Sequence, residues 1–287
     1  MAVPLIKKLR ALLVLGRISN LPTVWSNCLA VWLLQGSPVG DDFFRIITAA
    51  SACYIGGMYL NDACDVDFDR QYRPERPIPA GHITLRSVWI WAGLWLLLGL
   101  LLILPSGIKA TGLGLGLVAA VVVYDAFHKG FRLAPWLMAS CRLLLCLVAA
   151  AAAQPVISPA VWVHGLVLLA YVAGLSFLAR GESGGVKSRR WPLLLLIVPL
   201  VVCLIQSAGR SALAWVAVAL QVGWTVWALR PLRQQQAGGI GRTVGALLAG
   251  IVLVDWAALP APLNETSLAF VGLFLLARFW QRTVPAT

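Results

Sequence analysis

A run of acidic side chains within residues 61–82 is the part of the sequence best suited to chemistry. If the preceding apolar helix continues into this run, Asp62, Asp65 and Asp69 fall at positions i, i+3 and i+7 and share one face. Asn61 adds an amide at the same end of the helix, whereas Asp67 is expected to point elsewhere. Three like charges on one face repel one another, so the spacing predicts a bound cation. Mg²⁺ is the natural candidate, because it prefers hard oxygen ligands and completes its shell with water and substrate phosphates.

Arginines follow the acids directly. Arg70, Arg73 and Arg76 offer donors that match phosphate oxygens. Prolines in residues 74–79 and Gly81 then end the helix and favour a turn. The spacing therefore favours a magnesium and phosphate site, and the alternative is a solvated charged loop that only caps a helix.

The rest of the chain indicates how this site is held. Hydrophobic residues make up 60% of the sequence, charged residues only 12%, and the mean hydropathy is +0.84. Ordinary soluble chains carry about 25% charged residues. A bilayer core needs about 20 apolar residues in a helix, and the long, non-alternating runs here favour helices over barrel strands. The predicted fold is all-α: a polytopic transmembrane helical bundle forming a single integral membrane domain over residues 1–287.

We expect about nine to ten spans. The N-terminal apolar run exceeds the core of a secretion signal and is predicted to be an anchor. The ten candidate segments are Ala11–Leu34, Phe43–Leu60, Val88–Leu104, Ile108–Tyr124, Ala134–Ala153, Val161–Ala179, Trp191–Gln206, Ala212–Leu229, Thr243–Leu259 and Ser267–Trp280.

Basic residues predict the orientation of the bundle. With the N-terminus inside, nineteen Lys and Arg residues lie in inside segments, three lie outside, and Arg142 lies within a span. Basic loops stay cytoplasmic. We therefore expect a multi-pass protein of the cell (inner) membrane, with the N-terminus, the loop at 61–87 and a second loop at 180–190 in the cytoplasm.

The net charge of +12 could suggest nucleic-acid binding. Nucleic-acid binding needs a basic face on a water-exposed domain, and no such domain is predicted. The charges are expected to set topology and to meet anionic membrane lipid. Six cysteines lie in or beside apolar spans without zinc-like spacing, and the three histidines also lack metal-ligand spacing. The residues carry no signal for an oligomeric state.

The acidic run resembles a known signature. The pattern Asn-Asp-x-x-Asp-x-x-x-Asp, followed by Arg-Pro-x-Arg-Pro-Ile-Pro-x-Gly, is similar to the first motif of the UbiA family of membrane prenyltransferases. The resemblance extends to Arg17 and Asn20 near the first span, and to Tyr124 and Lys129 near the fourth. Tyr124-Asp-Ala-Phe-His-Lys-Gly also resembles the divergent UbiA-like branch called EboC.

The resemblance implies an activity. Members of the family transfer an isoprenoid chain from a polyprenyl diphosphate to a lipid-like, often aromatic, acceptor inside a lipid-open helical cavity. It implies that Asn61, Asp62, Asp65 and Asp69 are catalytic and hold the diphosphate through Mg²⁺. Arg73, Arg76 and Lys129 would neutralise further phosphate charge, and Tyr124 would line the chamber in which the carbocation is protected from water.

One loop departs from the family pattern. A second acidic motif is expected after the sixth span, but residues 180–187 offer one carboxylate, Glu182, between Arg180 and Lys187. The residues predicted to bind substrate are Arg17, Asn20, Asn27, Arg73, Arg76, Arg142 and Glu182. Either Arg180 and Lys187 replace a second metal, or diphosphate binding is lost or altered. The alternative function is accordingly a non-catalytic or altered UbiA-like protein that binds or moves an isoprenoid or aromatic lipid in a membrane complex.

Polar residues inside the predicted spans carry two interpretations each. Asn20, Thr23 and Asn27 share a helical face, as substrate contacts or as hydrogen bonds between helices. Arg142 lies two turns into its span and Asp255 late in the ninth, where unpaired charge is costly. Arg142 either faces the cavity or has a structural partner, and a mutual ion pair with Asp255 is one option.

Overall fold

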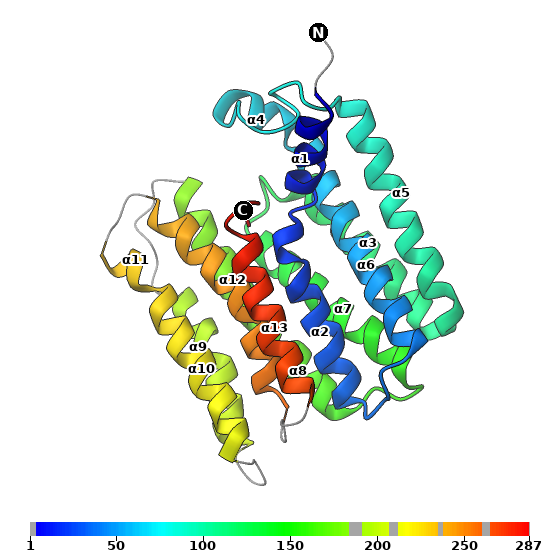
Figure 1. The fold of residues 1–287 in the computed structure, drawn as a ribbon, viewed down its shortest axis with the longest axis vertical. Helices are drawn as coiled ribbons and strands as arrows, with labels where there is room; N and C mark the ends of the chain where they lie inside the picture. Colours follow the sequence, from blue (N-terminus) through cyan, green and yellow to red (C-terminus); the bar gives the residue numbers. More distant parts are fainter. Residues whose placement is uncertain (1–3, 184–190, 207–211, 235–237, 260–264, 287) are drawn as a thin grey trace.

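The protein is described here by a computed structural model. It describes residues 4–183, 191–206, 212–234, 238–259 and 265–286. Within these ranges every regular element is a helix, and most of the helices run side by side along the long axis of the molecule (Figure 1). The predicted all-α fold is confirmed.

The helices are numbered in chain order, with η for 3-10 turns. They are α1 (Leu5–Leu15), η1 (Ile18–Asn20), α2 (Leu21–Leu34), α3 (Asp41–Cys64), α4 (Val66–Tyr72), α5 (Leu85–Ile103), η2 (Leu104–Ser106), α6 (Ile108–Phe127), α7 (Ala134–Ala153), α8 (Pro159–Ser183), α9 (Pro192–Ile205), α10 (Ala212–Ala228), α11 (Arg230–Arg233), α12 (Gly239–Ala257) and α13 (Glu265–Trp280).

Each of the ten segments predicted to span the membrane is largely helical in the structure. Among the described residues, six helices are long and apolar enough to cross a membrane: α3, α5 with η2, α6, α7, α8 and α12. Shorter apolar helices occur at Pro192–Ile205 and Thr266–Trp280. The count of nine to ten spans stays a prediction.

The first predicted span, Ala11–Leu34, is interrupted. Helix α1 ends at Leu15, a single 3-10 turn follows, and α2 begins at Leu21. Arg17, between them, has a φ of 41° in the left-handed region, which side chains other than glycine seldom adopt. The sequence prediction missed this break because it joined the apolar runs on either side into one span, although residues 16–20 are mostly polar and Pro22 follows.

The bundle has a central helix and a lipid-facing edge. The apolar window of α12 is 72% buried, whereas that of α5 is 28% buried, and α5 lies at one edge in Figure 1. Trp91, Leu94, Leu97 and Leu101 of α5 are exposed. An outer face this apolar is suited to lipid and unsuited to water.

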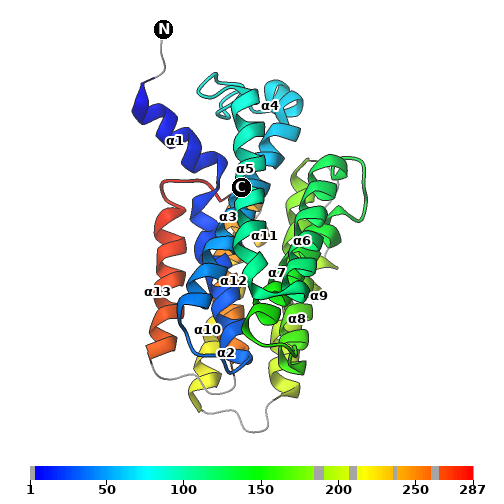
Figure 2. The same ribbon diagram turned by 90° about the vertical axis from the view of Figure 1, so that its right-hand side faces the viewer.

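Close packing of α3 against α5 fixes the end of α3 that carries the acidic residues. A Cβ at Gly56 of α3 would lie 2.8 Å from Leu96, and one at Gly99 of α5 would lie 2.3 Å from Cys53 Sγ. Small residues let membrane helices approach in this way. Figures 1 and 2 show α1 and α4 gathered at the same end of the molecule as this end of α3.

Candidate active site

The acidic residues lie where α3 turns into α4. Asn61 and Asp62 occupy the last turn of α3, and Asp65 joins the two helices. The residues Asp62 and Asp69 are buried, with 3% and 4% of their surface exposed. The side chain of Asp67 is 88% exposed and pairs with Arg70 at 3.0 Å. The predicted division is therefore observed: three acids on the inner face and Asp67 outside.

Arginines from two segments contact the buried carboxylate of Asp62. Arg17 Nη2 lies 3.3 Å from Asp62 Oδ1 and donates to Asn61 Oδ1 at 3.1 Å. Arg76 Nη1 lies 3.5 Å from Asp62 Oδ2. A left-handed non-glycine residue costs on the order of 1–3 kcal/mol and persists only where its surroundings hold it. The contacts of Arg17 with the end of α3 supply such a restraint.

The loop after α6 brings two further cationic groups to Asp65. Lys129 Nζ lies 2.8 Å and His128 Nε2 3.4 Å from Asp65 Oδ1. Burial alone would raise the pKa of Asp65, but the hydrogen bonds from His128 and Lys129 outweigh burial and lower it. The same hydrogen bond raises the pKa of His128. Tyr124 stacks on His128, with ring centroids 5.0 Å apart.

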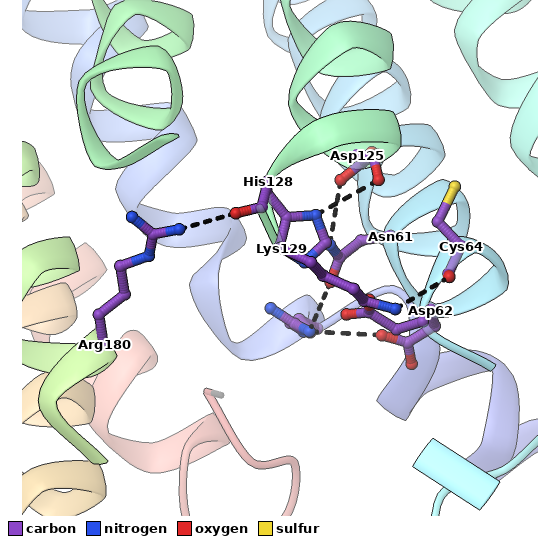
Figure 3. A network of polar contacts seen from close by, with 9 residues as sticks. Asn61, Asp62, Cys64, Asp125, His128, Lys129 and Arg180 are labelled. Atoms are coloured by element: carbon purple, nitrogen blue, oxygen red, sulfur yellow. Dashed lines mark hydrogen bonds and ion pairs between the residues drawn. The ribbon is translucent and has the colours of Figure 1, made fainter. Parts of the chain in front are cut away.

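Asp125 joins this cluster, although it was not among the site residues predicted from the sequence. Asn61 Nδ2 donates to Asp125 Oδ1 at 3.0 Å, as Figure 3 shows. Asp125 Oδ2 is buried and has no hydrogen-bond partner among the described residues. The available signal was its position beside Tyr124 and three residues before His128, because residues at these spacings share one end of a helix.

Arg180, in the last turn of α8, contacts the loop that carries His128 and Lys129. Its Nη2 donates to the carbonyl oxygens of His128 at 2.7 Å and Phe131 at 2.8 Å, and its Nη1 to that of Arg132 at 3.1 Å. Figure 3 shows Arg180 reaching this loop from the side opposite to Asp62. The guanidinium therefore holds backbone groups.

A cavity of about 1370 Å³ opens beside these residues. Its polar part includes Arg17, Asn61, Asp65 and Lys129. Its apolar part extends between the helices, and the residues there include Val24, Ala50, Leu117, Val121, Leu145, Val172, Leu248 and Ile251. The chamber thus joins a charged mouth to a hydrocarbon-like interior.

Most of the predicted site residues meet at this cavity. Those that line it are Arg17, Asn20, Asn61, Asp65, Arg73, Arg76, Tyr124, Lys129 and Arg142. Asp62, Asp69 and Asn27 lie outside the lining, although Asp62 contacts Arg17 and Asn27 contacts Arg142. The side chain of Glu182 lies outside the described residues, as does Lys187.

The acidic groups offer oxygens of the kind that a divalent cation needs. No group of three His, Cys, Asp or Glu side chains is already arranged around a metal position within the described residues. However, Asp69 Oδ1 and Asp125 Oδ2 are buried oxygens without hydrogen-bond partners, and burial raises the pKa of Asp69. Hard, desolvated carboxylate oxygens of this kind suit Mg²⁺. The residue types therefore fit the ion.

Arg142 and Asp255 do not pair directly. Arg142 Nη1 donates to Asn27 Oδ1 at 2.7 Å, and Asn27 Nδ2 donates to Asp255 Oδ1 and Oδ2 at 2.8 and 2.7 Å. Asn27 therefore bridges Arg142 and Asp255, for which a direct ion pair was one of the options left open by the sequence.

Comparisons with known proteins agree on one family. The family model described as the UbiA prenyltransferase family matches residues 19–251. A 4-hydroxybenzoate octaprenyltransferase from Cupriavidus necator is 27% identical over 226 residues, which cover 73% of this chain and 76% of that protein.

Solved structures show the same fold. A UbiA homologue from Aeropyrum pernix K1 superposes with a TM-score of 0.66 at 17% identity, covering 84% of this chain and 96% of that one. A UbiA homologue from Archaeoglobus fulgidus, solved with GPP and Mg²⁺ bound, superposes with a TM-score of 0.50 at 14% identity, covering 96% and 97%.

Proposed function

Because this chain belongs to the UbiA prenyltransferase family, we propose that it transfers an isoprenoid chain from a polyprenyl diphosphate to a lipid-like acceptor in the membrane. The observation that carries the proposal is the cavity, whose charged mouth suits a diphosphate and whose apolar interior suits an isoprenoid chain. The two parts of such a substrate need these two environments at once.

The mouth offers cations where negative charge develops on the leaving diphosphate. Arg17, Arg76 and Lys129 line the cavity beside the acidic residues, and each already contacts a carboxylate there. Arg73 also lines the cavity, stacked over Phe68 at 5.7 Å. Fixed cations of this kind stabilise the transition state more than the ground state, and removing one such contact typically lowers rates by about 10² to 10³.

Asn61, Asp62, Asp65 and Asp69 are the residues that would hold Mg²⁺, and the free oxygen of Asp125 adds a fifth candidate donor. When bound, the ion supplies Lewis-acid stabilisation of the departing diphosphate. Support comes from the Archaeoglobus fulgidus homologue, which was solved with GPP and Mg²⁺. In this chain the same carboxylates also orient Arg17, Arg76 and Lys129.

The interior excludes water from the reacting carbon. Val24, Leu117, Val121 and Leu145 line the chamber. An allylic cation in a wet site would be captured by water, whereas an apolar wall leaves the acceptor as the available nucleophile. Tyr124 lines the cavity and stacks on His128, so in this proposal it would meet the first carbons of the chain.

We infer that the mouth faces the cytoplasm of a cell with an inner membrane. Support comes from the basic residues, nineteen of which fall in segments on the side that carries the acidic motif. A tag reporter at the N-terminus, probed by protease in sealed vesicles of known orientation, tests this placement.

Prenyl transfer is tested in membranes with radiolabelled polyprenyl diphosphates of several lengths and a panel of acceptors. We expect turnover that requires Mg²⁺ and that is lost in both Asp62→Ala and Asp65→Ala. A matched control is Asp67→Ala, because this acid is exposed and faces away from the cavity.

The alternative, a protein that binds or moves an isoprenoid lipid, makes a different prediction in the same assay. Wild-type protein would then bind the polyprenyl diphosphate without releasing inorganic diphosphate and without modifying any acceptor. Turnover that is unaffected by Asp62→Ala and Asp65→Ala would contradict the proposed role of the acidic residues.

A further inference from the structure

A chain of polar side chains crosses the interior of the bundle beside the cavity. It runs from Arg142 of α7 through Asn27 of α2 to Asp255 of α12, and His164 Nε2 of α8 lies 3.1 Å from Asp255 Oδ1. Ser26 also donates to Asp255. Asn27 and Asp255 have no exposed surface. Charge buried in a membrane bundle is costly and usually serves a function.

Asp255 is satisfied without a direct contact to Arg142. Both of its oxygens accept from Asn27, and Ser26 and His164 approach it as well. Asn27 can therefore present only its Oδ1 to Arg142, because its amide nitrogen is engaged by the carboxylate. This arrangement compensates the charge of Arg142 at a distance and fixes the orientation of the guanidinium.

The hydrogen bonds of Arg142 occupy one side of its guanidinium. Nη1 donates to Asn27 Oδ1 and to the carbonyl oxygen of Thr23, and Nη2 donates to Thr23 Oγ1. A guanidinium has five N–H donors in a rigid plane. Because Nη1 and Nη2 both donate to Thr23, we infer that the edge between them faces that residue. This leaves the Nε hydrogen and the second Nη2 hydrogen, which lie parallel along the other edge. No described residue accepts a hydrogen bond from that edge, and Arg142 lines the cavity.

The depth of Arg142 separates it from the diphosphate site. It contacts α2 at Thr23 and Asn27, which follow the mouth residue Asn20 by three and seven positions. At 1.5 Å per residue, the guanidinium lies about 5–10 Å further into the bundle than the mouth. Met138, Leu145 and Ile251 line the same cavity.

We propose that the free Nε–Nη2 edge of Arg142 binds an anionic group of the acceptor, a carboxylate or a phosphate, and so selects acidic acceptors over neutral ones. The proposal rests on the prenyl transfer function proposed above. A planar anion accepts two parallel hydrogen bonds from such an edge. The distance to the mouth leaves room for a small acceptor body between its anionic group and the reacting carbon of the prenyl chain.

Acceptor binding tests the proposal without turnover. Purified protein in detergent is saturated with Mg²⁺ and a non-reacting thiolo analogue of geranyl diphosphate, and radiolabelled probes are measured by equilibrium dialysis. The two probe pairs are 4-hydroxybenzoate with 4-hydroxybenzamide, and geranylgeranylglyceryl phosphate with geranylgeranylglycerol. The pair that shows selectivity distinguishes a carboxylate acceptor from a phosphate acceptor.

We expect wild type to bind the anionic member of one pair about 10- to 100-fold more tightly than its neutral partner. In Arg142→Gln this preference is lost, whereas affinity for the neutral partner changes less than about threefold. Arg142→Lys keeps the charge but lacks the paired donors, so an intermediate preference is expected. Arg45→Gln is the matched control, because Arg45 bonds to Leu102 and Ser106 and is not among the cavity residues.

Equal affinity of wild type for both members of each pair overturns the proposal, and this result requires no variant to fold. Preserved selectivity in Arg142→Gln also overturns it. If Arg142 has only a structural role, Arg142→Gln should lower the thermal stability and reduce the binding of the anionic and neutral probes equally. If anion selectivity depends on Arg142 but no acceptor is ever prenylated, the proposed function fails and the binding site stands. If transfer proceeds without selectivity, this proposal alone fails.

Discussion

The loop formed by residues 128–133 is held from two sides by different chemistry. At the end of α3, Asp65 contacts the side chains of His128 and Lys129. At the end of α8, Arg180 donates three hydrogen bonds to the backbone of the same loop. The α3 side therefore carries carboxylates that can exchange one cationic partner for another, whereas the α8 side carries a cation already used to shape the loop.

The difference between the two sides bears on the loop at residues 180–190, which lacks the second acidic motif of the family. The sequence left open whether Arg180 and Lys187 act as fixed cations in place of a second metal. In the structure Arg180 lines the cavity while its guanidinium is bonded to carbonyl groups. We therefore expect Arg180 to contribute to phosphate binding mainly by positioning the loop that carries Lys129. The α3 side and the α8 side therefore differ in chemistry: the first presents carboxylates, and the second presents a cation that holds the 128–133 loop in place.

The largest expected effect comes from the α3 side. Asp62→Asn removes the charge that faces Arg17 and Arg76, and we expect prenyl transfer to fall by about 100-fold or more. Thermal stability should also fall, since two partly buried guanidinium groups lose their counter-charge. The measurement is the initial rate in membranes, together with a melting curve of the purified protein. Asp67→Asn, on the exposed side of α4, should change the rate less than about twofold. Equal losses in the two variants would break the comparison.

Arg180→Gln tests the α8 side. Losing three hydrogen bonds to the 128–133 backbone should let Lys129 move, and we expect the rate to fall about tenfold, since small displacements of positioning groups are costly. Hydrogen exchange should rise for amides of residues 128–133 and stay unchanged at Asn61. Arg132→Gln is the control, because Arg132 contributes its backbone carbonyl to Arg180. A lost rate without faster exchange would instead indicate that Arg180 contacts the substrate.

How much of this could be predicted from the sequence depends on the range of each interaction. The helical segments and the outward position of Asp67 follow from local periodicity. The break at Arg17 does not, because the contacts that hold it are with Asn61 and Asp62, more than forty residues away. Local patterns contain no record of such a partner.

Asp125 and Asn27 show the same limit. Asp125 ends an apolar run, and its position near Tyr124 and His128 was the one local signal; its contact with Asn61 of α3 comes from the packing of α3 against α6. Asn27 was considered as either a substrate contact or a hydrogen bond between helices, and the structure places it between Arg142 and Asp255. A sequence gives the polar inventory of each span, but the rotation of one helix against the next decides which polar groups meet.

The contacts on the α3 side and on the α8 side of the 128–133 loop should respond differently to pH. The pKa of His128 is raised by its hydrogen bond to Asp65, so its stabilising effect is fully present below the unfolded value of about 6.5 and is lost as pH rises through the folded value. In metal-free buffer, the decrease in melting temperature caused by His128→Gln should become smaller as the pH rises from 5.5 to 9. The loss in Arg180→Gln should stay constant over this range, because neither partner titrates. A constant deficit in both variants would indicate that Asp65 holds the loop through Lys129 instead.

The smallest effect is expected at Glu182. It was predicted to contact substrate because it is the one acid in residues 180–187, where the family pattern calls for at least two. A single carboxylate flanked by Arg180 and Lys187 leaves this segment net positive, so Glu182→Gln makes it more attractive to a diphosphate. We expect an unchanged or slightly lower KM for the polyprenyl diphosphate and a rate within about twofold of wild type. A loss as large as that of Asp62→Asn would show that the α8 side does supply an acidic ligand, and the chemical difference between the two sides would disappear.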